Sequence, residues 1–138
     1  MTQIIIMRGL PGSGKSTKAR KLSTLIGAVI VSADDWYTLP DGTYAYNPKQ
    51  IQFAHAACQF AARAALRSRF PVIVDNTNIQ KRHVKPYLDL AREFDVPLTY
   101  QQSGTPWAFD VDECFRRNTH GVPRERIQQM KDDWENLP

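Results

Sequence analysis

The chain has little cysteine and no long apolar run. Its two cysteines, Cys58 and Cys114, show no metal-ligand spacing, so we expect reduced, structural thiols. No stretch approaches the roughly 18 apolar residues that a membrane span needs. The apolar run near Met1 is too short for a signal peptide and has no basic region before it. These absences predict a soluble protein without a membrane partner, either cytoplasmic or nuclear.

Repeats and low-complexity tracts are also absent. The length of 138 residues predicts one domain, 1–138, and an ordinary balance of 42% hydrophobic and 23% charged residues predicts a globular core that needs no disulfide or metal. The net charge of +4 is a small excess. It suits an anionic partner such as a nucleotide or a nucleic acid, but many proteins without such partners share it.

Short apolar runs alternate with segments of helical period along the chain. This pattern predicts an α/β fold with βα repetition around a parallel sheet. The expected strands cover residues 3–8, 28–31, 71–74 and 97–101. The expected helices cover residues 15–26, 47–68, 81–94 and 107–118, and a last one starts near Pro123. Asn47 and Pro48 suit the cap and the first position of the second helix.

The most specific signal is the segment Gly9-Leu10-Pro11-Gly12-Ser13-Gly14-Lys15-Ser16. It fits the pattern G-x-x-x-x-G-K-[ST], and it lies between a predicted strand and a predicted helix, as a phosphate-binding loop (P-loop) does. Glycines let the backbone approach phosphates, successive amides form an anion-binding nest, and the helix N-terminus adds positive potential. The alternative is a glycine-rich turn without a ligand.

The loop predicts a site for ATP and Mg²⁺. Lys15 is expected to reach the β- and γ-phosphates, Ser16 to bind Mg²⁺ through its hydroxyl, and Thr17 to hold the α-phosphate. The other expected nucleotide-binding residues are Gly9, Pro11, Gly12, Ser13 and Gly14.

Carboxylates follow two of the predicted strands, at the edge where open α/β sheets bind ligands. Asp34 and Asp35 follow the second strand, and one of them is a candidate base for an acceptor hydroxyl. The chemistry alone does not choose between them, and helix capping is the alternative. Asp75 ends the third strand, where it could orient Mg²⁺ directly or through water; the alternative is a capping turn.

Arginines near a break at Gly121 suggest a lid over the site. Arg116 and Arg117 could clamp the transferring phosphoryl group, and Arg124 and Arg126 are further candidates. The alternative is a solvated helix face. In that case Asp112 would pair with Arg116 and Glu113 with Arg117, each at i,i+4 spacing.

The acceptor side is less defined. His55 and Gln59 lie one turn apart on the second predicted helix and could line an acceptor pocket. Four aromatic side chains flank the exit of the second strand and could stack on bases or close a small core: Trp36, Tyr37, Tyr44 and Tyr46.

Four blocks, in order, resemble the 5′-kinase domain of phage-type polynucleotide kinases and related small P-loop kinase domains of larger animal proteins. The blocks are 9–17, 32–36, 72–78, and 116–118 with 122–123. The resemblance implies that Asp34 is the general base, that Arg117 contacts the donor phosphates, and that Asp75 organises the acceptor site. Asp35, Tyr37 and His55 are the further candidates for acceptor binding. The resemblance also implies a three-layer fold, adenylate-kinase-like, with a four-stranded sheet of order 2-3-1-4 and a C-terminal lid.

Two positions depart from that family. Tyr37 stands where the phage-type enzymes have an arginine for the acceptor phosphate, and residues 119–121 replace a longer loop with a second lid arginine. The favoured reading is an ATP-dependent polynucleotide 5′-hydroxyl kinase. A kinase of small-molecule hydroxyls (a sugar, nucleoside or antibiotic) and a non-catalytic ATP-binding module are the alternatives.

Overall fold

A four-stranded parallel sheet forms the centre of the computed structural model, which describes residues 1–138. Its strands are β1 (Ile4–Arg8), β2 (Val29–Val31), β3 (Val72–Asp75) and β4 (Leu98–Gln102). The spatial order is β2-β3-β1-β4, which confirms the predicted order 2-3-1-4. In the central strand β1, Ile4 is in register with Val72 of β3 on one side and with Leu98 of β4 on the other.

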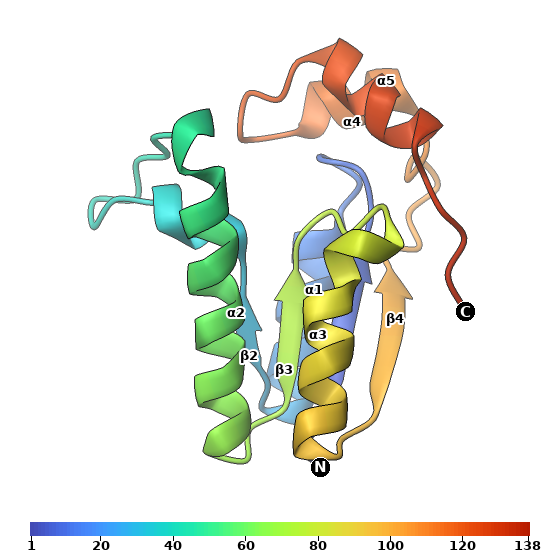
Figure 1. Cartoon of the computed structure of the whole chain (residues 1–138). Coiled ribbons are helices and arrows are strands. Elements are labelled where there is room, and N and C mark those ends of the chain that lie inside the picture. Colours follow the sequence, from blue (N-terminus) through green and yellow to red (C-terminus); the bar gives the residue numbers. More distant parts are fainter.

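Helices cover both faces of this sheet, so the three-layer prediction is confirmed. Figure 1 shows α2 (Ile51–Arg67) and α3 (Lys81–Phe94) on one face and α1 (Lys15–Ile26) on the other. The larger apolar core lies between the sheet and α2 and α3, and a smaller core lies beneath α1. None of the helices has both the length and the apolarity that a membrane crossing requires.

The start of α2 differs from the prediction. Asn47 does act as a cap, because its side chain accepts a hydrogen bond from the Lys49 amide at 3.0 Å. The residues that follow form a 3-10 turn, η2 (Pro48–Gln50), before the α-helix begins at Ile51. A second 3-10 segment, η1 (Ala33–Tyr37), follows β2 and packs on α2 through the buried Ala54.

Two short helices, α4 (Val111–Arg117) and α5 (Arg124–Asp132), lie beyond the carboxyl ends of the strands (Figure 1). We call residues 111–132 the lid. The predicted helix 107–118 begins four residues later than expected, because the Asp110 side chain accepts from the Glu113 amide and caps α4 there. The lid shares a small core of four buried residues with the P-loop segment: Leu10, Val111, Cys114 and Ile127.

A buried arginine joins the sheet to the end of the chain. Arg8, the last residue of β1, donates to the carbonyl oxygens of Asn78, Ile79 and Glu135 at 2.7, 2.8 and 2.7 Å. Its guanidinium also lies 4.2 Å from the centre of the Trp134 ring. Burial lowers the pKa of Arg8 below its ordinary value. Arg8 therefore fixes the loop after β3 and the segment after α5 relative to each other.

Candidate active site

The conformation of the predicted P-loop requires glycine at two positions. Gly12 has a φ of 80° and Gly14, directly before α1, has a φ of 95°, both in the left-handed region. A Cβ atom on Gly12 would lie 2.1 Å from the carbonyl oxygen of Cys114 in α4, and one on Gly14 would lie 2.9 Å from Thr105 Cγ2. The loop is thus enclosed by the segment after β4 and by the lid.

The hydrogen bonds of the loop leave its inner amides free. Thr105 donates to the Ser13 carbonyl at 2.7 Å, and the Trp107 indole donates to the Gly12 carbonyl at 3.1 Å. By contrast, the N–H groups of Gly12, Gly14, Lys15 and Ser16 have no acceptor within the protein. A row of free amides at a helix N-terminus fits bound phosphate oxygens.

Lys15 and Asp75 lie together beside the loop. Burial lowers the pKa of Lys15, and the negative charges of Asp75 and Asp34 partly oppose this effect. The Oδ1 atom of Asp75 is buried and has no hydrogen-bond partner. A buried carboxylate oxygen without a partner fits an additional ligand, such as a metal-bound water.

The residues present fit Mg²⁺ only together with a nucleotide. The chain contains no group of three or more His, Cys, Asp or Glu side chains that could hold a metal. Mg²⁺ usually takes one or two protein oxygens and completes its shell with water and phosphate oxygens. The exposed Ser16 hydroxyl and the Asp75 carboxylate match that limited contribution.

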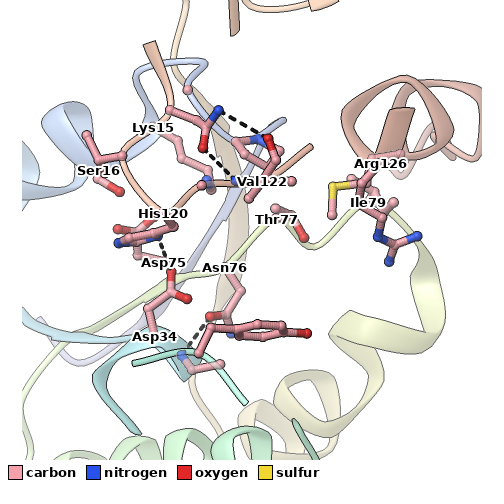
Figure 2. Close-up of a pocket in the computed structure, with 18 of the residues that line it drawn as sticks. Lys15, Ser16, Asp34, Asp75, Asn76, Thr77, Ile79, His120, Val122 and Arg126 are labelled. Atoms are coloured by element: carbon pink, nitrogen blue, oxygen red, sulfur yellow. Dashed lines mark hydrogen bonds and ion pairs between the residues drawn. The ribbon is translucent and has the colours of Figure 1, made fainter. Parts of the chain in front are cut away.

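The two carboxylates of the Asp34–Asp35 pair occupy different surroundings. Asp34 lines the cavity, whereas Asp35 does not. The Tyr44 hydroxyl donates to Asp34 Oδ1 at 2.8 Å, and His120 Nδ1 lies 3.2 Å from Asp34 Oδ2 (Figure 2). Ser32 caps η1 by accepting from the Asp34 amide, so the capping role belongs to Ser32 and leaves the Asp34 carboxylate facing the cavity.

One cavity of about 1100 Å³ joins the loop, the sheet edge and the lid. Fourteen of the residues that the sequence singled out line it: Pro11, Gly12, Gly14, Lys15, Ser16, Thr17, Asp34, Tyr37, Tyr44, Tyr46, His55, Asp75, Arg117 and Arg126. Seven do not line it: Gly9, Ser13, Asp35, Trp36, Gln59, Arg116 and Arg124. The first two of these seven pack closely within the loop, since a Cβ on Gly9 would lie 2.6 Å from the buried Ser13 Oγ.

Three of the lid arginines form ion pairs, two with Glu113 and one with Asp112. Arg117 lies over Trp107, 3.8 Å from the ring centre, and its Nε donates to Glu113 at 2.7 Å. Arg116 also pairs with Glu113, and both arginines lower the pKa of Glu113 to about 2. The expected Asp112–Arg116 pair is wrong. Asp112 pairs instead with Arg124, because the start of α5 lies against α4.

Of the four aromatic residues after β2, three line the cavity and one does not. Tyr37 is buried and contacts Tyr44 and Tyr46 edge-on, with ring centres 5.9 and 5.0 Å apart. All three line the cavity, and Tyr44 stacks on His120 at 4.2 Å. Trp36 does not line the cavity; it stacks on Phe53 of α2 instead.

The sequence reasoning missed several cavity residues. Trp107 follows β4 at the same sheet edge, and this position is the signal that could have identified it. His120 had no such signal, because its contact with Asp34 joins residues far apart in the sequence. Arg82 and His83, at the start of α3, also line the cavity and follow the strand that ends at Asp75.

Comparisons with known proteins agree with this architecture. The family model described as an AAA domain, AAA_33, matches residues 4–137. Human NEDD4-binding protein 2 is 37% identical over 136 residues, which are 97% of this chain and 8% of that protein. The 2′,3′-cyclic-nucleotide 3′-phosphodiesterase of Pongo abelii is 23% identical over 130 residues, which are 93% of this chain and 30% of that enzyme. The chain therefore spans less than a third of either relative.

Solved structures share the fold at low sequence identity. A chain of the Pnkp1/Rnl/Hen1 RNA repair complex superposes with a TM-score of 0.75 at 24% identity, covering 96% of this chain and 43% of that one. Chaetomium thermophilum Kti12 in complex with ADP-AlF3 gives 0.69 at 22%, covering 96% and 80%. A gluconokinase from Sinorhizobium meliloti gives 0.60 at 19%, covering 97% and 75%. The P-loop at the end of β1, the strand order and the family match lead to one conclusion: this chain belongs to the AAA_33 family of AAA domains and has the fold of P-loop kinases.

Proposed function

We propose that this chain is an ATP-dependent polynucleotide 5′-hydroxyl kinase. The observation that carries the proposal is that Asp34 and Lys15 line one cavity, with the free amides of the P-loop beside them. A kinase can use such a carboxylate, because the acceptor hydroxyl loses its proton as the phosphoryl group is transferred.

The donor side binds ATP through the loop. Its inner amides and Lys15 bind the β- and γ-phosphates, and Thr17 holds the α-phosphate. Ser16 and Asp75 would hold Mg²⁺, directly or through water, and the bound ion would offset the negative charge of the phosphates. Kti12, which shares this fold, was solved in complex with ADP-AlF3, and this supports nucleotide binding by the present chain.

The transfer step follows from this arrangement. The acceptor 5′-oxygen forms a bond to the γ-phosphorus, the bond from that phosphorus to the bridging oxygen of ADP breaks, and the hydroxyl proton passes to the Asp34 carboxylate. Lys15 and Arg117 neutralise the charge on the phosphoryl oxygens. Arg117 lies beside the loop, since it stacks on Trp107, which is hydrogen-bonded to Gly12.

The polynucleotide acceptor has two kinds of support. The four sequence blocks resemble phage-type polynucleotide kinases, and a chain of an RNA repair complex shares the fold over 96% of this chain. A small-molecule hydroxyl is the second candidate acceptor. Tyr37 in place of the acceptor arginine and the fold shared with a gluconokinase favour it.

The test is transfer of γ-labelled phosphate from ATP to 5′-OH DNA and RNA oligonucleotides with Mg²⁺, with wild type beside Asp34→Asn. We expect label on the oligonucleotide with the wild type only, while ATP binding, measured by calorimetry, stays within about threefold in the variant because Asp34 faces the acceptor. If Asp34→Asn is as active as wild type, the general-base assignment is wrong. If the wild type binds ATP but labels no oligonucleotide, the polynucleotide assignment is wrong, and a panel of sugars and nucleosides then tests the second candidate.

A further inference from the structure

One end of the cavity carries positive charge that the donor site does not use. We call this region, made of Arg82, His83 and Arg126, the cationic end; all three residues line the cavity. The Arg126 side chain makes no ion pair or hydrogen bond, and Arg82 donates only to the neutral Gln80 amide oxygen, at 2.9 Å. Two guanidinium groups therefore face the cavity without a carboxylate partner.

The other arginines of the lid are paired with carboxylates, so the lack of a carboxylate partner at this end of the cavity is particular to Arg82 and Arg126. Arg124 lies two residues before Arg126 and pairs with Asp112, and Arg117 pairs with Glu113. Arg124 is also outside the cavity, whereas Arg126 lines it. The lid thus pairs its outer arginine with a carboxylate and leaves its inner arginine unpaired.

The pKa of His83 reflects the positive charge at this end of the cavity. Burial lowers the pKa of His83, and the positive charges of Arg82, His55 and Arg126 lower it further, while Glu135 alone among the nearby carboxylates opposes them. The Nδ1 atom of His83 accepts a hydrogen bond from the Gln80 amide at 3.3 Å. Three other basic groups therefore lie close enough to the half-buried ring of His83 to affect its pKa.

The cationic end lies across the cavity from the P-loop residues Lys15 and Ser16 (Figure 2). Figure 2 shows Arg126 beside Ile79, on the side of the cavity away from Asp34 and His120, with Asn76 and Thr77 between them. The wall near Arg126 includes the apolar side chains of Ile79, Val122 and Met130. A ligand whose hydroxyl lies at Asp34 could thus extend along the loop after β3 toward Arg126.

We infer that the cationic end binds the first phosphodiester of the acceptor, so that the enzyme selects a 5′-OH strand over a neutral sugar or nucleoside. This inference rests on the proposed function, because it takes the acceptor hydroxyl to lie at Asp34. Guanidinium groups match phosphate oxygens in charge and geometry. Arg82 and Arg126 would then supply the charge that Tyr37, in place of an arginine, does not.

The kinetic test compares wild type with Arg82→Ala and Arg126→Ala, and uses Arg124→Ala as the matched control. The acceptors are a short 5′-OH oligonucleotide and the same oligonucleotide with a neutral methylphosphonate at its first linkage. We expect Arg126→Ala to raise the KM for the charged acceptor about tenfold, as the loss of one charge-assisted contact does, and to leave the KM for ATP unchanged. Arg82→Ala should act in the same direction and Arg124→Ala should stay within about twofold of wild type. The wild type and the control should lose more affinity with the neutral linkage than Arg82→Ala or Arg126→Ala does.

Two results would overturn the inference. A rise in the KM for ATP alone in Arg126→Ala would make that residue a donor clamp of the lid. A variant that still distinguishes the two linkages as strongly as wild type would show that the phosphodiester is bound elsewhere.

Equilibrium binding separates this inference from the proposed function. Fluorescence anisotropy measures how wild type and Arg126→Ala bind a labelled 5′-OH oligonucleotide without ATP, over a range of salt concentrations. We expect weaker binding and a salt slope smaller by about 0.7 in the variant, the value for one lost phosphate contact on a single strand. Equal binding by both proteins contradicts the inference even if transfer occurs. A difference in binding without any transfer would contradict the kinase assignment and leave the phosphate site standing.

Discussion

The Nδ1 atom of His120 in the lid lies 3.2 Å from Oδ2 of Asp34. The Tyr44 hydroxyl donates to the other oxygen of the same carboxylate, and the rings of Tyr44 and His120 stack. Both oxygens of the proposed base are therefore in contact with side chains, and an acceptor hydroxyl has to displace one of them. His120 is the simpler one to displace, since it lies in the loop between α4 and α5 and is exposed.

His120→Phe should lower the KM for the acceptor. The phenyl ring can keep the stacking on Tyr44, but it cannot compete for the Asp34 carboxylate. An exposed polar contact of this kind contributes up to about 1 kcal/mol, so the expected decrease is about two- to fivefold. Steady-state kinetics at saturating ATP measures it, and His120→Ala, which also removes the stacking, is the companion variant. A higher KM in His120→Phe would mean that His120 itself contacts the acceptor.

Lys15→Met should abolish transfer and raise the melting temperature. Burial lowers the pKa of Lys15, so the folded state disfavours the charged amine. This destabilisation is present in full below the folded pKa and disappears as the pH rises toward the unfolded value of about 10.4. The variant should therefore melt at a higher temperature than wild type at pH 7, with a smaller difference at pH 10, as buried polar functional groups often cost stability.

Calorimetry without nucleotide tests this expectation, with the exposed Lys21→Met as the control. The control should melt within about 2 °C of wild type at both pH values, as surface substitutions usually do. If Lys15→Met melts below wild type at pH 7, the contacts of Lys15 with Asp75 and Asp34 outweigh its burial.

Gly12→Ala should damage the protein more than Gly104→Ala. Both glycines have positive φ, 80° and 72°, so alanine adds a strain of about 1 kcal/mol at either position. At Gly104 the new Cβ would meet nothing within 4 Å, whereas at Gly12 it would lie 2.1 Å from the Cys114 carbonyl oxygen. We expect a loss of about 1 kcal/mol for Gly104→Ala, and a larger loss together with weakened ATP binding for Gly12→Ala. Urea unfolding and ATP titration measure both, and equal losses would show that strain alone matters.

Arg8→Met should destabilise the fold by about 3 kcal/mol, because it leaves three carbonyl oxygens without their charged donor. Trp134 loses its contact with the guanidinium and should change its fluorescence. Urea unfolding gives the free energy, and Arg92→Met, at an exposed position of α3, should stay within about 0.5 kcal/mol of wild type. A loss below 1 kcal/mol in Arg8→Met would mean that water replaces the lost donor.

Local patterns in the sequence predicted most of the fold. The P-loop is a contiguous motif, and the bounds of α1 and α3 agree with the expected 15–26 and 81–94 because each has a clear apolar period or loop signal. The strand order came from the resemblance to a family and is confirmed. The predicted start of α4 was wrong because the side-chain cap at Asp110 outweighed the apolar pattern before it.

The parts of the fold and of the site that the sequence did not predict depend on contacts between distant residues. Arg8 and Glu135 are 127 positions apart and Gly12 and Trp107 are 95 apart, so neither contact follows from a local pattern. For the same reason, the sequence did not predict that Arg124 pairs with Asp112 while Arg126 has no partner. That choice depends on how α5 packs against α4, which the composition of either helix does not reveal.

The shared core of the P-loop and the lid limits how the site can open. Leu10 is buried with Val111, Cys114 and Ile127, so moving α4 and α5 away as a body would expose Leu10 and this core to water. The short loop of residues 118–121, which carries His120, contributes no side chain to this core. Access for the acceptor then depends on a small loop, whose motions take nanoseconds to microseconds, and not on a hinged domain, which needs microseconds to milliseconds. Opening of the site should therefore not limit the rate of turnover.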